Sequence, residues 1–450
     1  MKRGIILVCL CSVLILGLVS LAVFAEVKPN GLISDNAVLQ QGMRVPIWGT
    51  ADSGEKVTVK FQNQQVTTTA HNGNWIVWLN PLKPGGPFTM WINDLEIKNI
   101  LVGEVWLCSG QSNMAWPMSR VENAEAEIKT ANDPMLRLYL VPKTKDPAPL
   151  PQAWKECTPE SVANFSAVGY YFGQHLRKAL KVPVGLIDSS VGGTPAESWT
   201  STRALLAVPE LRDLVGKDGG RPVAYLYRAM IQPLVPYAIK GVIWYQGESN
   251  ASRAQEYRIL LPTMIKCWRN AWAQGDFPFL IVQLAPYGRT SKPDTWPELR
   301  EVQLFTAQTV PNTGIVVITD YGDCEDIHPK QKKPVGERLG LLARGIAYGE
   351  KIVYSGPIYR SMKIEGNKAI LSFDWAKGLH SKGGDLKGFT VAGEDHNFVP
   401  AKAEIVGENV VVYSPEVQKP VAVRYGWSDC PDVNLFNGAG LPASPFRTDN

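Results

Sequence analysis

The chain has 450 residues, of which 45% are hydrophobic and 20% are charged. This composition excludes a disordered, collagen-like or polytopic membrane protein, and the length predicts two or three domains, or one large domain with smaller attachments. The formal net charge is +4, from 46 Lys and Arg against 42 Asp and Glu. Such a small excess gives no electrostatic basis for binding phosphates, so we expect no nucleic-acid partner.

Residues 1–25 have the pattern of a secretory signal peptide. Lys2 and Arg3 precede an uncharged, mostly apolar run from Gly4 to Phe24, and Ala25 is a small residue of the kind found before a cleavage point. The run is about twenty residues, which is also just long enough to span a bilayer, so an uncleaved membrane anchor is the alternative. We therefore expect a secreted or periplasmic protein, with no membrane partner unless this segment stays attached.

Residues 26–100 consist of short runs in which apolar and polar residues alternate, such as Lys56–Phe61 and Trp75–Trp78. Turn signals rich in Gly, Asn and Pro separate these runs. Alternation with period two, broken at close intervals by turn residues, predicts strands. We interpret this region as an N-terminal β-sandwich domain.

In residues 101–352, predicted strands alternate with predicted helices, which indicates an α/β domain with a parallel sheet. The strands are expected at Glu104–Cys108, Val184–Asp188, Gly241–Tyr245, Phe279–Leu284 and Gly314–Thr319. The helices are expected near Val121–Ala131, Val162–Leu180, Gln255–Ala273 and Leu299–Thr309, with a last one from Pro334 to about Tyr348.

Residues 353–425 form a second β-rich region, with candidate strands at Ala369–Phe373, Gly388–Val391 and Val410–Tyr413. Residues 426–450 show little periodicity, and we expect them to pack back on the core. Of the seven cysteines, two lie in the signal segment and five remain, so at most two disulfides can form. No cysteine spacing is typical of a zinc site, so we expect no metal.

The residues that carry chemistry follow the predicted strands of the α/β domain, where ligands bind in open α/β sheets. His328 is the only one of the five histidines that follows such a strand and lies beside acids, which favours it as a general base. Ser112 is the candidate nucleophile, with Ser109 as its alternative. A backbone N–H of the pair Gly192-Gly193 and the Gln246 side chain are candidate oxyanion donors. The alternatives are a plain turn, which is the default for paired glycines, and a buried, hydrogen-bonded amide.

Four strings, GEVWLCSGQSNM, VGLIDSSVGGTPAESW, KGVIWYQGESN and DIHPKQKKPVGERL, resemble those of sialate O-acetylesterase-like carbohydrate esterases of the SGNH (GDSL-like) hydrolase superfamily. The resemblance extends to ISDNAVLQQ near the start and WSDCPDVNLFNGAGLPASPFRTD near the end, so it covers nearly the whole mature chain. It implies a flavodoxin-like, three-layer α/β core with a parallel sheet, flanked by β-sandwich-like domains. It also implies catalysis without a cofactor.

Carried onto this chain, the resemblance implies Ser112 as nucleophile and His328 as base. The oxyanion hole would consist of the amides of Ser112 and Gly192 and the side chain of Gln246, which replaces the asparagine more usual in the superfamily. We favour Asp326 as the acid of the triad, because Asp-Ile-His-Pro is similar to the sequence in these esterases.

The common superfamily spacing of three residues before the histidine would select Glu325 as the acid instead, and Asp323 is a further alternative. Four residues close to the motifs are weaker candidates for substrate contact, and the tryptophans among them have core packing as the alternative: Trp116, Trp199, Glu248 and Asn250.

Together these features predict an exported serine esterase that removes acetyl groups from a sugar through an acetyl-enzyme, similar to a sialate 9-O-acetylesterase. One alternative is the same machinery acting on other esters, such as acetylated xylan, pectin or simple lipids. An alternative of another class is a carbohydrate-binding protein with an inert α/β core.

Overall fold

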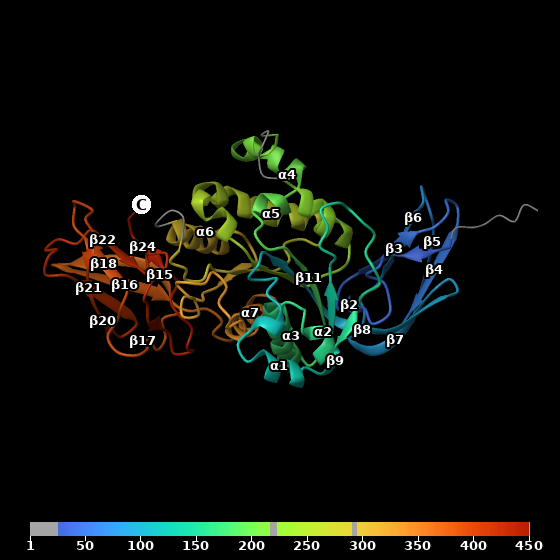
Figure 1. The fold of residues 1–450 in the computed structure, drawn as a ribbon, viewed down its shortest axis with the longest axis horizontal. Coiled ribbons are helices and arrows are strands. Elements are labelled where there is room, and N and C mark those ends of the chain that lie inside the picture. Colours follow the sequence, from blue (N-terminus) through green and yellow to red (C-terminus); the bar gives the residue numbers. More distant parts are fainter. Residues whose placement is uncertain (1–25, 217–222, 290–294, 450) are drawn as a thin grey trace, which may run out of the picture.

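The computed structural model describes residues 26–216, 223–289 and 295–449, so the predicted signal peptide lies outside the described residues. Figure 1 shows a β-rich region at each end of an elongated molecule and an α/β region between them. No helix within the described residues combines the length and the apolar character that crossing a bilayer requires.

A seven-strand path forms the centre of the molecule, in the spatial order β10-β9-β11-β8-β12-β13-β14. All neighbours on this path are parallel except β10, which is antiparallel to β9. The strands are β8 (Leu95–Gly110), β9 (Asp133–Leu140), β10 (Lys155–Cys157), β11 (Val184–Ser190), β12 (Gly241–Tyr245), β13 (Phe279–Val282) and β14 (Thr313–Val316). The predicted α/β fold with a parallel sheet is confirmed, with β9 and β10 as strands that the sequence patterns had not predicted.

Helices cover both faces of this sheet and make the three layers visible in Figure 1. On one face lie α3 (Ala167–Leu180) and α7 (Lys333–Ile346), which pack on each other. On the other face lie α5 (Ala254–Trp272) and α6 (Thr295–Thr309). The shorter helices are α1 (Ala124–Thr130), α2 (Pro159–Val162) and α4 (Thr202–Ala207).

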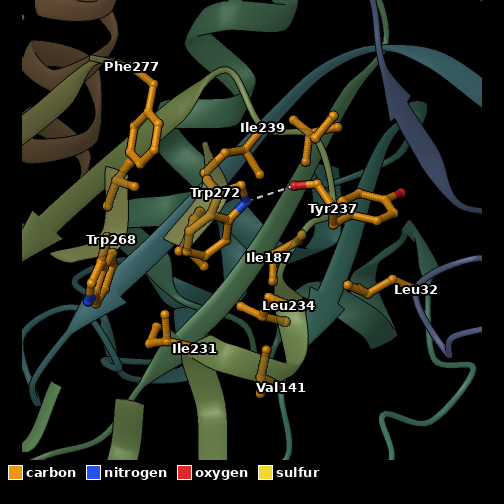
Figure 2. Packing of buried hydrophobic residues seen from close by; sticks show 14 of the residues in the cluster. Leu32, Val141, Ile187, Ile231, Leu234, Tyr237, Ile239, Trp268, Trp272 and Phe277 are labelled. Atoms are coloured by element: carbon orange, nitrogen blue, oxygen red, sulfur yellow. Dashed lines mark hydrogen bonds between the residues drawn. The ribbon is translucent and has the colours of Figure 1, made fainter. Parts of the chain in front are cut away.

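Strand alternation divides the buried side chains of β8 between two hydrophobic clusters. Val105 and Leu107 belong to the cluster with α5 and α6, whereas Trp106 and Cys108 belong to the cluster with α3 and α7. Figure 2 shows part of the first cluster, where the Trp272 indole donates to the carbonyl of Tyr237 at 2.8 Å. The second half of β8 is therefore buried on both faces, and it leads directly into the turn that carries Ser112.

The N-terminal β region is joined to the α/β region through β8 itself. The first half of β8 pairs antiparallel with β7 (Gly85–Ile92) and parallel with β2 (Val38–Gln40), and its second half enters the central sheet. The boundary expected at residue 100 therefore falls inside one continuous strand. The remaining strands of this region are β1 (Lys28–Pro29), β3 (Val45–Thr50), β4 (Lys56–Phe61), β5 (Gln64–Thr69) and β6 (Asn74–Leu79).

Two four-stranded sheets and one strand pair make up the C-terminal region. One sheet has β15 (Ile358–Glu365), β16 (Lys368–Asp374), β20 (Lys402–Val406) and β21 (Asn409–Tyr413). The other has β18 (Phe389–Ala392), β19 (Val399–Pro400), β22 (Ala422–Tyr425) and β24 (Phe446–Arg447), and β17 (His380–Ser381) pairs with β23 (Leu435–Phe436). The last residues of the chain thus supply strands to this region.

Residues 428–444 also contact the α/β core directly. The buried Arg300 guanidinium of α6 donates to the carbonyls of Ser428 and Asp429, each at 2.8 Å, and the Gln283 amide donates to the Ser444 hydroxyl at 2.9 Å. A disulfide joins Cys324 to Cys430. The other described cysteines, Cys108, Cys157 and Cys267, are free and buried.

Candidate active site

The turn after β8 carries Ser112 at the carboxyl edge of the sheet. Gly110 ends the strand with a φ of +141°, and a Cβ at this position would lie 2.1 Å from the Tyr245 carbonyl oxygen of β12. Only glycine therefore fits this close approach of two strands. The chain then turns sharply, with the Gln111 N–H donating to the same Tyr245 carbonyl at 2.9 Å.

Ser112 and His328 are in direct contact across the edge of the sheet. The Ser112 Oγ lies 2.9 Å from Nε2 of His328, which stands on the loop between β14 and α7. The competing Ser109 is fully buried, and its hydroxyl donates to the Ser189 carbonyl at 2.5 Å. The structure therefore places Ser112, and not Ser109, beside a base.

Among the three candidate acids, Asp326 contacts the imidazole. Its Oδ1 is 3.6 Å from Nδ1 of His328 and accepts the His328 backbone N–H at 2.9 Å. Glu325 is exposed and pairs with Arg289, while Asp323 accepts the backbone N–H groups of Glu325 and Asp326. Of the three candidate acids, Asp326 is therefore the one whose carboxylate lies beside the imidazole.

The surroundings of His328 lower its pKa from the ordinary value of 6.5. Burial is the largest cause, and the positive charge of Lys332 adds to it, whereas Asp326 acts in the opposite direction. The Trp116 ring stacks on the imidazole, with centroids 4.9 Å apart and planes at 19°. A neutral imidazole is what a base needs to accept the Ser112 proton.

The turn after β11 brings Gly192 close to Ser112. A Cβ at Gly192, just after β11, would lie 3.3 Å from Cβ of Ser112, so the two backbones approach closely. Within the described part of the chain, neither the N–H of Ser112 nor that of Gly192 donates to another group. Free donors beside a nucleophile are the arrangement that stabilises an oxyanion.

Gln246 has different partners from those expected of an oxyanion donor. The side chain is fully buried, and its Nε2 donates to the Thr194 carbonyl at 3.2 Å and to Asn250 Oδ1 at 2.7 Å. Its Oε1 accepts the Tyr257 hydroxyl at 2.9 Å. Both amide hydrogens are therefore directed at other protein groups, because the loops after β11 and β12 meet at this side chain.

Two predictions of substrate contact are wrong. Trp199 is fully buried, donates to the Thr194 hydroxyl at 2.9 Å and packs edge-on against Trp244, so it cannot stack on a sugar. Asn250 is also fully buried, accepts the Ala196 N–H at 2.9 Å and donates to Glu197. Both residues hold the loop after β11 in place.

The other two candidate contacts lie next to Ser112 and His328. Trp116 is partly exposed and stacks on the His328 imidazole. The Glu248 carboxylate accepts from the Asn113 amide at 2.7 Å, and its other oxygen is buried without a partner among the described residues. Glu248 therefore lies beneath the site, in a polar cluster with Asn113.

The motifs did not single out Asn113 or Lys332, which belong to that polar cluster. Asn113 is 1% exposed and accepts a hydrogen bond from the Lys332 ammonium, which is also 1% exposed. Lys332 belongs to the string DIHPKQKKPVGERL, but nothing local distinguishes it from the exposed Lys330 beside it. No group of three or more His, Cys, Asp or Glu side chains in the described ranges could hold a metal ion.

Comparison with known proteins identifies the family. A family model described as "Carbohydrate esterase, sialic acid-specific acetylesterase" matches residues 102–340. The sialate O-acetylesterase of Homo sapiens is 33% identical over 92% of this chain and 91% of its own length, and that of Mus musculus is 32% identical over 89% and 90%. The chain belongs to this family.

A solved structure supports the same assignment for the whole architecture. A carbohydrate acetylesterase from Xanthomonas citri superposes with a TM-score of 0.88 at 40% identity, covering 94% of this chain and all of that one. The resemblance stated from the sequence motifs is thereby confirmed, and the chain is a member of a family of carboxylic ester hydrolases. Both Ser112 and His328 lie inside the matched residues.

Proposed function

We propose that this family member is an exported serine esterase that hydrolyses O-acetyl esters on a carbohydrate through an acetyl-enzyme. The contact of 2.9 Å between Ser112 Oγ and His328 Nε2 carries this proposal. A serine hydroxyl becomes a useful nucleophile when a neutral imidazole at hydrogen-bonding distance accepts its proton. The position of the pair at the carboxyl edge of the parallel sheet, where ligands bind in such folds, supports it further.

The reaction follows from the geometry. Ser112 Oγ attacks the acetyl carbonyl carbon while His328 Nε2 takes the hydroxyl proton, and the N–H groups of Ser112 and Gly192 stabilise the oxyanion. Collapse of the intermediate breaks the ester bond, and His328 returns the proton to the departing sugar oxygen. Water then attacks the acetyl-enzyme with His328 as base, which releases acetate and restores Ser112.

Two observations support export and the choice of substrate. The Cys324–Cys430 disulfide is typical of an oxidising compartment, in agreement with the signal-peptide pattern of residues 1–25. The names of the human and mouse relatives make O-acetylated sialic acid the first substrate to test, and acetylated xylan and pectin are the alternatives.

The decisive experiment measures acetate release from these substrates by the wild type, Ser112→Ala and Ser119→Ala. Ser119 is an exposed serine seven positions further along the chain, so its variant controls for a general effect of losing a hydroxyl. We expect Ser112→Ala to lose at least about 10³-fold in kcat and Ser119→Ala to keep wild-type activity. Activity retained in Ser112→Ala would exclude the serine mechanism. Sequencing of the exported protein should place its N-terminus at Glu26.

A further inference from the structure

One buried side chain connects the two sides of the catalytic pair. Asn113 follows the nucleophile Ser112, and its Nδ2 donates to the carbonyl of Ile327, the residue before His328, at 3.0 Å. The same Nδ2 donates to Glu248 Oε1 at 2.7 Å, and Oδ1 accepts from the Lys332 ammonium. Asn113 therefore joins the turn after β8, the loop after β12 and the loop that carries the base.

Lys332 is an unusual residue for this position. It directly precedes α7, is 1% exposed, and forms no direct ion pair among the described residues. Its Nζ lies 5.5 Å from the ring centroid of Tyr245 and 5.8 Å from that of Trp116, the ring that stacks on His328. Burying an ammonium costs solvation free energy, and two aromatic rings and one amide oxygen offset only part of that cost.

The orientation of the Asn113 amide is fixed by two charged groups, the Lys332 ammonium and the Glu248 carboxylate. Its oxygen faces the Lys332 ammonium, and its N–H groups face the Glu248 carboxylate and the Ile327 carbonyl. Rotation of the amide by half a turn would direct its N–H groups at the ammonium and its oxygen at the carboxylate, and both contacts would be repulsive. The link to the His328 loop is therefore held in one geometry.

We propose that Lys332, Asn113 and Glu248 form a buried positioning chain that sets the separation of Ser112 and His328 and places a positive charge near the imidazole. This inference rests on the proposed serine esterase function. Lys332 and Asn113 act through Ser112 and His328 and need no contact with substrate, so they are positioning residues.

The charges around His328 are consistent with the proposed positioning chain. His328 faces Asp326 on its own loop, Ser112 and Trp116 from the turn after β8, Arg120 from the short 3-10 helix Met118–Arg120, and Lys332. The cations Lys332 and Arg120 add to the effect of burial in lowering the pKa of His328, and Asp326 opposes them. Burial lowers the pKa of Lys332 itself to about 7, so the ammonium is charged throughout the mildly acidic range.

The test compares Lys332→Met, Lys332→Gln and Lys333→Met with the wild type in kcat, KM and the pH profile of acetate release. Lys333 is the matched control, because this neighbouring lysine is exposed and pairs with Glu127. We expect Lys332→Met to lower kcat by about 10²-fold with KM nearly unchanged, since small misplacements of reacting groups cost this much. Its acidic limb in kcat/KM should move to higher pH, because His328 loses a nearby cation.

Lys332→Gln removes the charge but keeps a donor for Asn113, so it should recover most of kcat while the limb stays displaced. Lys333→Met should match the wild type. If the acidic limb of the kcat/KM profile does not move in either Lys332 variant, the inference is overturned, even where kcat falls. A merely structural role would lower kcat without displacing this limb. If Lys332→Met does not fold, the limb of Lys332→Gln decides.

Ser112→Ala, measured in the same assay, separates this inference from the proposed function. Loss of activity in Ser112→Ala together with an unmoved limb in the Lys332 variants overturns the positioning chain alone. Activity retained in Ser112→Ala overturns the serine mechanism itself.

Discussion

The disulfide between Cys324 and Cys430 ties the loop that carries His328 to the C-terminal region. Cys324 lies four residues before His328, in a stretch of the chain without regular secondary structure. Two other contacts hold the same point: the Gly288 N–H donates to the Cys324 carbonyl at 2.8 Å, and Glu325 pairs with Arg289. Cys430→Ser removes the covalent link and leaves these contacts in place.

The size of the effect on stability follows from the length of the closed loop. The two cysteines are 106 residues apart, and the chain-entropy model gives about 4.7 kcal/mol for a loop of about 100 residues. This is an upper value, because a compact denatured state has less entropy to lose than a random chain. We expect Cys430→Ser to lower the free energy of unfolding by about 2–4 kcal/mol, the usual range for native disulfides.

The effect on activity should be smaller than the effect of losing the base. Cys430→Ser removes the disulfide but keeps the two other contacts of the loop. We expect kcat to fall by about 10-fold, since the imidazole is less well held against the Ser112 hydroxyl. The assay combines denaturant unfolding of the C-terminal region with acetate release. Cys267→Ser is the matched control, because Cys267 is buried and free.

Reduction of the wild type should reproduce the behaviour of Cys430→Ser, and the variant itself should not respond to reductant. The reasoning is refuted if Cys430→Ser unfolds within about 0.5 kcal/mol of the wild type, the range of an ordinary surface substitution. An unchanged kcat in the variant would show that the covalent link does not position His328.

Three further predictions concern the site and its supporting strand. Gly192→Ala should lower kcat by at least about 10-fold in acetate release with intact folding, because its Cβ would lie 3.3 Å from that of Ser112 and displace an oxyanion donor. The acidic limb of kcat/KM should have its midpoint below pH 6.5, because the pKa of His328 is lowered and only the neutral imidazole accepts the Ser112 proton; a midpoint above 6.5 contradicts this. Burial raises the pKa of Asp188 from 3.8 to about 7, so the folded state retains a proton that the unfolded chain has lost, and stability should fall as pH rises from about 4 to about 7. Asp188→Asn should abolish this fall, which unfolding at pH 5 and pH 8 would reveal.

Local sequence patterns predicted the strands that carry the site. The expected strand Gly241–Tyr245 coincides with β12, and the polar strings after β8, β11 and β12 all lie at the carboxyl edge of the sheet. Such strands can be predicted from the sequence because strands that are buried on both faces are nearly continuous apolar runs, here bounded by turn signals. Strand β9 escaped prediction, since it begins at Asp133-Pro134 and carries the charged Arg137 in its interior, where distant polar groups satisfy it.

Local patterns were enough to indicate which chemistry is available: a serine, a histidine with acids nearby, glycine amides and the family motifs that contain them. Tertiary structure alone decided which of these groups meet. In the folded chain Asp326, and not Glu325, lies beside the imidazole, and two of the five remaining cysteines pair. Trp199 and Gln246 are buried, and Lys332 contacts Asn113, 219 positions away in the chain. The physical reason is that burial and contact between distant segments depend on how the layers pack, whereas composition and spacing report only on neighbours in the chain.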